Sequence, residues 1–323
     1  MDELVDLLEK KTVAEPEFLC SVEQGSLSGT RGLINQSATC WLNTMVQTIY
    51  SMSVFNHTLN KKKQVVETQG SALAKVWLHL IGKLRPDAPE DIKFQKDRVG
   101  ITLLEIFRAE ISRHKVSDDT NGQQSPINNL IQFIELFDIP DIINLFNCRY
   151  HTVGKCKCGG GFDRSEGFSP IRRLRSDINL MTNMVAAVQQ TTEIINDWYC
   201  ESCKVKTNLA VTFDLRRAPP IFIFEITKGQ KYPSVFVLRA TDTTWLHYRL
   251  ISVIVHIGAT SIDSSFGHYK AITLVPAKKF YPGKAGRIYV EYDDTVVTPG
   301  VAPESSDAIA LRYELEKTSA LPV

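Results

Sequence analysis

The stretch GLINQSATCWLNTMVQTIY, residues 32–50, joins a polar segment to a helical pattern. From Cys40 onward, apolar residues recur three and four positions apart, which predicts an amphipathic helix that begins at this cysteine. Thr39 and Ser37 are residue types that cap helix N-termini. A thiol in the first helical turn feels the positive end of the helix dipole, which favours the reactive thiolate. Cys40 is therefore a candidate nucleophile, and a buried structural cysteine is the alternative.

Helical and β-type patterns occupy different halves of the chain. Helical periods predict helices over residues 2–10, 71–84, 101–113, 127–138 and 141–146. Runs rich in β-branched and aromatic residues predict strands over residues 209–215, 221–226, 234–238, 248–257, 268–275, 287–292 and 308–315. This segregation predicts an α+β fold whose second half is mostly an antiparallel sheet.

Composition and charge exclude several classes of protein. The chain has 323 residues, of which 43% are hydrophobic and 23% charged, values typical of a soluble globular protein. A formal net charge of +1 gives no reason to expect a nucleic acid or an anionic membrane as partner. No apolar run approaches the roughly 20 residues of a membrane span, and the acidic N-terminus does not resemble a secretory signal. We expect an intracellular protein, in the cytoplasm, the nucleus or both.

Two histidines compete for the role of a general base. His268 follows Gly267, which permits a close approach, and precedes a strand that would hold the imidazole rigidly. His256 lies inside the apolar run SVIVHIG and has the surroundings of a buried, hydrogen-bonded histidine. We therefore favour His268 as the base.

Two more polar features could complete a catalytic site. Asp293 and Asp294 end the strand that follows the His268 strand, so a hairpin could bring one carboxylate to the imidazole Nδ1 and fix its tautomer. The residues themselves leave open which aspartate does so, or whether the pair is a simple turn. Asn35, five residues before Cys40, could donate to a developing oxyanion, although it too could be a turn residue.

Four of the seven cysteines form two close pairs. An odd number of cysteines without a signal peptide argues against a disulfide scaffold. Four thiolates on two turns would make a tetrahedral structural zinc site, with no catalytic role for the metal. A redox C-x-x-C motif is the alternative, but no βαβ pattern surrounds it. The predicted ligands are Cys156, Cys158, Cys200 and Cys203.

Three segments in order resemble the ubiquitin-specific protease family of papain-like cysteine proteases. GLINQSATCWLNTMVQ (32–47) resembles its cysteine box, YRLISVIVHIGATSIDSSFGHYKAI (248–272) its histidine box, and YVEYDDTVV (289–297) the segment that follows. The likeness extends over about residues 31–316. It implies a helical thumb at about 31–147, zinc-tied β fingers at about 148–215 and an antiparallel β palm at about 216–316, between an N-terminal arm (1–30) and a C-terminal tail (317–323).

The resemblance also implies a role for each candidate residue. Cys40 would be the nucleophile, His268 the base and Asp293 the residue that orients the base. Asn35 would belong to the oxyanion hole, and Asp294 would be an auxiliary residue.

The implied reaction is hydrolysis of the bond after the C-terminal Gly-Gly of ubiquitin, usually an isopeptide bond to lysine. The implied partners are ubiquitin or a ubiquitin-like modifier and its conjugates. Three further residues would lie at the bound substrate: Gln124, Tyr269 and His256.

Several positions depart from the family pattern. Ser37 replaces the usual glycine of the cysteine box, and Trp41 its usual tyrosine or phenylalanine. Ile272 replaces an aromatic residue of the histidine box. In QQSPINN (123–129), Ser125 would replace an aspartate and Asn128 a glutamate that help to engage the basic tail of the modifier. These two changes motivate two alternatives: a protease for another ubiquitin-like modifier, or a non-catalytic module that binds ubiquitin.

Overall fold

The computed structural model describes residues 32–33, 35, 38–84, 124–166, 170–240, 244–258 and 267–320. The predicted arm (1–30) and the helices predicted at 2–10 and 101–113 lie outside this range, as does Ser37. The chain divides into two compact units, one of residues 1–143 with 251–309 and one of residues 144–250 with 310–323. Among the described helices, none has the length and hydropathy needed to cross a membrane.

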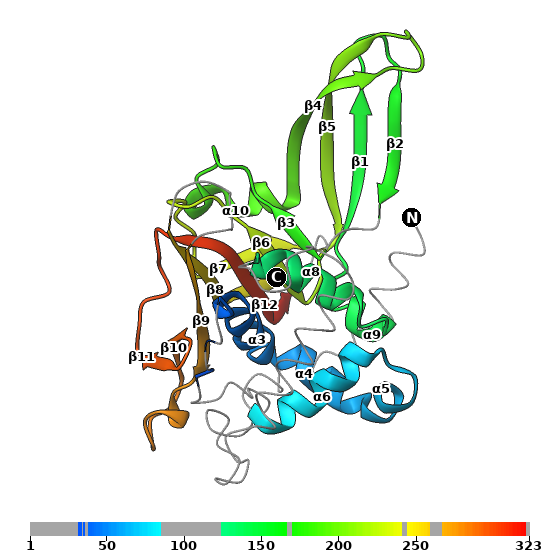
Figure 1. Cartoon of the computed structure of the whole chain (residues 1–323). Helices are drawn as coiled ribbons and strands as arrows, with labels where there is room; N and C mark the ends of the chain where they lie inside the picture. Colours follow the sequence, from blue (N-terminus) through cyan, green and yellow to red (C-terminus); the bar gives the residue numbers. More distant parts are fainter. Residues whose placement is uncertain are drawn as a thin grey trace. The chain divides into compact units, whose positions relative to one another are not determined.

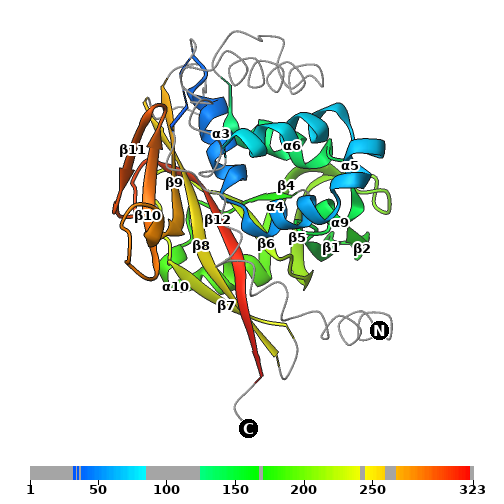
Figure 2. The ribbon, with the colours of Figure 1, turned by 90° about the horizontal axis from the view of Figure 1, so that it is seen from below.

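Six described helices belong to the first unit, and Figure 2 shows α3 to α6 grouped together. Predictions for the segments that begin at residues 40, 71, 127 and 141 are confirmed, with ends that differ by a few residues. Residues 53–69 also form helices, which the sequence analysis did not predict. The bounds are α3 (Cys40–Tyr50), α4 (Ser53–Lys61), α5 (Lys63–Gln69), α6 (Ala72–Leu84), α8 (Pro126–Glu135) and α9 (Pro140–Ile143).

Helix α3 is buried all round. It packs against strand β9 (His268–Pro276) on one side and α8 on another, and all 11 of its residues are buried. The predicted helix is therefore confirmed, but its polar side is buried as well as its apolar side. A helix between a sheet and a second helix has no side left for solvent.

A buried asparagine joins three helices of this unit. The Asn56 amide nitrogen on α4 donates to the carbonyls of Ile49, Tyr50 and Met52, each at 3.0 Å. Its Oδ1 accepts from the Trp77 indole on α6 at 3.3 Å. The single side chain therefore satisfies the carbonyls at the end of α3 and an indole N–H in the core.

An antiparallel sheet completes the first unit, with strand order β11-β10-β9-β8. Its strands are β8 (Thr244–Ile257), β9, β10 (Arg287–Asp293) and β11 (Val296–Pro299). Tyr269 faces His256 across β8 and β9, and Ala271 faces Tyr292 across β9 and β10. The predicted hairpin between the strands that carry His268 and Asp293 is confirmed.

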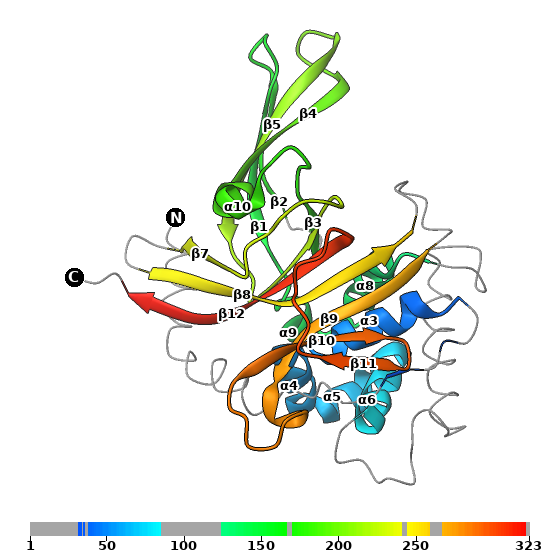
Figure 3. The same ribbon diagram turned by 90° about the vertical axis from the view of Figure 1, so that its left-hand side faces the viewer.

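The second unit contains two sheets. Figure 1 shows the first, with strand order β2-β1-β5-β4, and Figure 3 shows β7, β8 and β12 of the second side by side. In the second sheet β7 pairs with β8, followed by β12, β6 and β3. The bounds are β1 (Arg149–Lys155), β2 (Gly161–Glu166), β3 (Ile171–Arg173), α10 (Leu180–Gln189), β4 (Gln190–Tyr199), β5 (Lys206–Arg217), β6 (Ile221–Glu225), β7 (Val235–Arg239) and β12 (Ala308–Ala320).

The α+β class and the antiparallel character of the second half are confirmed, although β3 pairs with β6 in parallel. The sequence analysis did not predict β1 to β4, β11 or α10. The closing strand also continues past residue 315, because it pairs along β8. Arg249 Nε lies 2.8 Å from Glu316 Oε1, and His247 Nε2 lies 2.8 Å from Ser319 Oγ.

Replacing Asn56 with alanine is expected to lower the free energy of unfolding by about 3 kcal/mol, because several buried polar groups lose their partner. Urea denaturation followed by tryptophan fluorescence measures this loss. Asn60→Ala on the same helix is the matched control, since Asn60 is exposed. Equal losses in the two variants would contradict the structural role of Asn56.

Candidate active site

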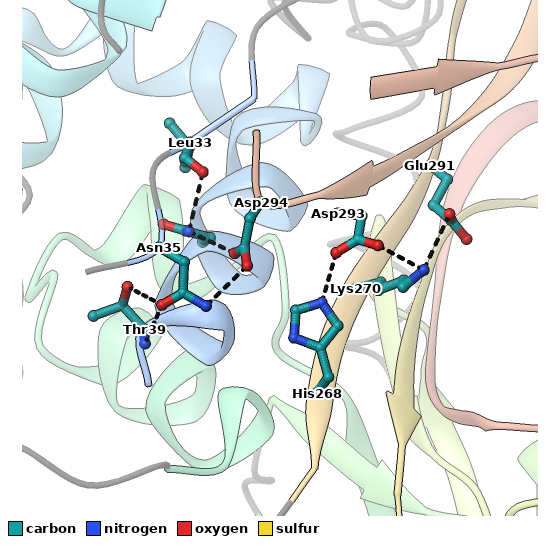
Figure 4. Close-up of polar contacts among 9 residues, drawn as sticks. Leu33, Asn35, Thr39, His268, Lys270, Glu291, Asp293 and Asp294 are labelled. Carbon is teal, nitrogen blue, oxygen red and sulfur yellow. Dashed lines mark hydrogen bonds and ion pairs between the residues drawn. The ribbon is translucent and has the colours of Figure 1, made fainter. Parts of the chain in front are cut away.

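His268 and Asp293 lie together on neighbouring strands (Figure 4). His268 begins β9 and Asp293 ends β10, and the Nε2 atom lies 2.6 Å from Asp293 Oδ1. This contact was predicted at Nδ1, and that detail is wrong. With the carboxylate on Nε2, the Nδ1 atom is the ring nitrogen left to face a nucleophile.

Gly267 brings the His268 backbone close to the neighbouring strand. Its φ angle is +137°, and a Cβ atom there would lie 2.2 Å from His256 Nε2 and 2.7 Å from the Ile257 carbonyl. His256 is buried and stacks on Tyr269, with ring centroids 4.3 Å apart. His256 is therefore packed beside the site, as the sequence analysis expected.

Asp294 has different contacts from Asp293. Its Oδ2 accepts from Asn35 Nδ2 at 2.9 Å, and its Oδ1 accepts from Asn43 Nδ2 on α3 at 2.7 Å (Figure 4). Its carbonyl accepts from the Leu33 N–H at 2.7 Å. The structure thus separates the two aspartates, which the sequence could not do: Asp293 contacts the imidazole, and Asp294 connects the segment before α3 to the β10–β11 turn.

Asn35 connects that turn to the start of α3. Its Oδ1 accepts from the N–H and from the hydroxyl of Thr39, at 3.0 and 3.1 Å. Thr39 occupies the N-cap position but makes no capping bond with its own side chain. The predicted cap is therefore replaced by the Asn35 carbonyl oxygen. An amide nitrogen carries two hydrogens, so the bond to Asp294 leaves a second donor on Asn35 Nδ2.

The Cys40 thiol lies at the start of α3, where the backbone N–H of Tyr269 contacts it. Burial is the largest influence and raises the pKa of this thiol above its ordinary value, and the charge of Asp294 adds to the rise. The N–H groups of Tyr269 and Trp41 lower the pKa by less. The helix N-terminus was expected to lower this pKa, but the combined effects raise it, because desolvation outweighs the N–H groups.

The segment around Gln124 begins α8. Ser125 is the N-cap of this helix, with its Oγ accepting from the Asn128 N–H at 3.4 Å, and Pro126 follows at the first helical position. Gln124 is buried, and its Oε1 accepts from Asn129 Nδ2 at 3.1 Å. Asn128 is exposed. Ser125 therefore has a clear role as a helix cap where an acidic residue was expected.

The four predicted cysteine ligands come together in the second unit. Their sulfurs all lie within 4.8 Å of one another. Sγ of Cys156 is 3.9 Å from that of Cys203, and Sγ of Cys158 is 3.5 Å from that of Cys200. Zinc bonded to four sulfurs at about 2.3 Å would hold them about 3.8 Å apart. The cluster therefore fits a tetrahedral zinc ion.

Tight turns aim these sulfurs inward. The Gly160 N–H donates to the Cys158 sulfur at 3.4 Å, and the backbone N–H of Cys203 is the main cause that lowers the pKa of Cys200 to about 6. A Cβ atom at Gly160 would lie 2.4 Å from Ser202 Oγ and 3.2 Å from Cys200 Sγ. The glycine after the C-x-C motif therefore lets the two turns approach closely enough for a shared ion.

Three positions that support the active site were not identified from the sequence. Asn43 follows Cys40 by three residues, and Gly32 touches the β10–β11 turn so closely that a Cβ atom would lie 2.4 Å from the Asp294 carbonyl. Lys270 contacts Asp293 at 2.7 Å. The signals were present in part: an asparagine on the buried helix one turn after Cys40, and a lysine two residues after His268 on the same strand.

Comparison with known proteins identifies the family. The sequence model described as ubiquitin carboxyl-terminal hydrolase matches residues 31–313. The chain is 30% identical over 330 residues to ubiquitin carboxyl-terminal hydrolase 36 of Drosophila mojavensis, covering 89% of this chain and 26% of the relative. The corresponding protein of Drosophila virilis is 23% identical, covering 88% and 26%. The chain thus spans about a quarter of the length of these curated relatives.

Solved structures support the fold. A chain of the SAGA DUB module Ubp8/Sgf11/Sus1/Sgf73 bound to monoubiquitin matches with a TM-score of 0.65 at 15% identity, covering 90% of this chain and 70% of that one. The same module bound to ubiquitin aldehyde gives 0.64 at 14% identity, covering 90% and 70%. The predicted fold class is thereby confirmed. Since the family match extends over most of its length, this chain belongs to the ubiquitin carboxyl-terminal hydrolase family, as its resemblance to ubiquitin-specific proteases predicted.

Proposed function

We propose that the chain is a thiol-dependent deubiquitinase that hydrolyses the bond after the C-terminal Gly-Gly of ubiquitin. The main support is the paired His268 and Asp293, with the Cys40 sulfur against the backbone N–H of the residue after His268. A thiol, an imidazole and a carboxylate in this order are the groups that nucleophilic acyl transfer requires. Family membership supplies the substrate class.

The first half of the reaction forms a thioester. In the proposed mechanism, the Nδ1 atom of His268 takes the Cys40 proton, and the thiolate attacks the carbonyl carbon of the terminal glycine. The tetrahedral intermediate then collapses and expels the lysine amine, which receives the proton from the imidazolium. Asp293 holds the ring by Nε2 throughout and stabilises its positive charge. Because burial raises the pKa of the Cys40 thiol, the mechanism needs a base that takes its proton.

The second half returns the free thiol. Water loses a proton to His268 and attacks the thioester carbonyl, and the second tetrahedral intermediate releases the ubiquitin carboxylate. The Cys40 thiolate leaves and regains its proton from the imidazolium. In both intermediates the second hydrogen of Asn35 Nδ2 is proposed to stabilise the oxyanion, while Asp294 positions that amide as an auxiliary residue.

The residues at the start of α8 favour a second candidate substrate. Gln124, Tyr269 and His256 are proposed to lie near the bound tail and to act through packing, because all three are buried. Ser125 and Asn128 provide no negative charge for a basic tail. A ubiquitin-like modifier with a less basic tail is therefore the second candidate substrate.

The zinc site is proposed to be structural. Cys156, Cys158, Cys200 and Cys203 would hold the ion and join the β1–β2 turn to the β4–β5 turn, at one end of the four-stranded sheet. Four sulfur ligands leave no open position for a substrate. We propose that this sheet belongs to the fingers, with thumb, fingers and palm at about residues 31–147, 148–215 and 216–316. Because thiolate ligands require a reducing compartment, we propose a location in the cytoplasm or nucleus.

Reaction with C-terminal electrophile probes tests the function. We expect a ubiquitin probe to label the purified chain and the label to disappear in Cys40→Ala, because the electrophile must bond to the nucleophilic sulfur. Matched probes of other ubiquitin-like modifiers identify the substrate, and Cys148→Ala serves as a control at another buried cysteine. Binding of ubiquitin without labelling would favour a non-catalytic module. Absence of both would overturn the proposal.

The two histidines are expected to respond differently to substitution. His268→Ala should lower kcat by about 10³-fold or more, because the general base is removed. His256→Ala should mainly lower thermal stability, because it removes a buried ring that stacks on Tyr269. Steady-state cleavage of a fluorogenic ubiquitin substrate and thermal melts measure the two effects. The opposite pattern would show that the base is misassigned.

The cysteine cluster is expected to bind about one zinc ion per chain. Elemental analysis of protein prepared without chelator measures the metal content. Cys203→Ser should lower zinc retention and the melting temperature together, because the structural site loses a ligand. Ser202→Ala, a neighbouring change that removes no ligand, should retain the metal. Wild-type protein that contains no zinc, and whose melting temperature does not change when zinc is added, would contradict the zinc site.

A further inference from the structure

Lys270 contacts the carboxylate that the proposed mechanism assigns to the base. Asp293 Oδ1 lies 2.6 Å from His268 Nε2, and Asp293 Oδ2 lies 2.7 Å from Lys270 Nζ (Figure 4). Each carboxylate oxygen therefore has its own cationic or proton-donating partner. The side chain of Lys270 is 18% exposed and that of Asp293 is 29% exposed, so the contact is sheltered from solvent.

The strands explain why these groups meet. Residues two apart on a strand point to the same face, so His268 and Lys270 of β9 lie on one face, as do Glu291 and Asp293 of β10. Lys270 Nζ lies 3.4 Å from Glu291 Oε1 as well as 2.7 Å from Asp293. The lysine therefore sits between two carboxylates, and the imidazole touches only the second.

The surrounding charges favour an ionised Asp293. Burial raises the pKa of its carboxyl, but the hydrogen bonds from Lys270 and His268 more than offset this, so the pKa is below its ordinary value. Asp294, the next residue, turns its carboxylate to Asn35 and Asn43. Helix α3, which packs against β10, contains the titratable residues Cys40 and Tyr50, and β11, which pairs with β10, contains no titratable residue.

We propose that Lys270 is a positioning residue for the reaction: it holds one oxygen of Asp293, and so keeps the carboxylate ionised with its other oxygen on His268. Glu291 balances the lysine charge, so that the pair adds little net charge beside the imidazole. The proposal rests on the proposed function in one respect, which is that Asp293 orients His268. Lys270 touches neither the sulfur nor the imidazole, so it acts through the aspartate.

The sign of the pH effect follows from the depressed pKa of Asp293. The Asp293 carboxyl group is ionised above that pKa, and it loses its negative charge as the pH falls through the pKa. In Lys270→Met the charge partner is removed, so the Asp293 pKa rises and the loss begins at a higher pH. The acid limb of the pH profile of kcat/KM should therefore shift to higher pH in this variant.

The experiment compares Lys270→Met with Lys270→Arg, which keeps the charge, and with Lys278→Met, which removes an exposed lysine of the same unit. We expect kcat/KM at neutral pH to fall roughly tenfold in Lys270→Met, about 1.4 kcal/mol, with most of the loss in kcat. Lys270→Arg should regain most of the activity and the acid limb. Lys278→Met should resemble the unaltered chain.

An NMR titration of the Asp293 carboxyl carbon gives a second readout that needs no substrate. A higher titration midpoint in Lys270→Met supports the role of Lys270. If the midpoint rises but the unaltered chain does not react with ubiquitin probes, the proposed function is wrong and the role of Lys270 still holds. An unmoved midpoint, or activity lowered equally at every pH, would show that Lys270 has only a packing role and would overturn the proposal.

Discussion

The turn at the end of β10 is the constraint on which the candidate active site depends. Asp293 is the last residue of the strand and contacts His268, while Asp294 has a φ angle of +50° and directs its carboxylate to Asn35 and Asn43. Two consecutive carboxylates thus serve two different groups. Because Asn43 lies on α3, the same turn ties the helix that carries Cys40 to the sheet that carries His268.

Much of this arrangement could be predicted from the sequence because local patterns determine it. The period of the α3 segment gave the helix start at Cys40, and the strand patterns gave a hairpin that brings residues 268 and 293 together. A glycine before His268 indicated close approach, and the structure shows His256 Nε2 in the space that a Cβ would need. The choice between Asp293 and Asp294 came from family resemblance alone, since two adjacent aspartates have no local difference.

The errors arise from long-range packing. Packing against β9 and α8 buries the polar side of α3 as well as its apolar side, and burial raises the pKa of the Cys40 thiol, which was expected to be lowered. Strand β4 was missed because most of its residues are exposed, so no alternation of apolar and polar positions marks it. The bond from Asp293 to Nε2 depends on how the ring lies between strands, and no sequence pattern contains that information.

The structure constrains positions of the family segments to different degrees. Gly32 and Gly267 stand at positions where the backbone leaves no room for a side chain, so substitution there would move a segment of the candidate site. Ser125 is a different case, because a serine caps α8 as well as an aspartate would. The helix start is therefore preserved while a negative charge near the proposed substrate tail is lost. Under the proposed function, such a change would alter which modifier binds without altering the groups around Cys40, so specificity and catalysis would vary independently.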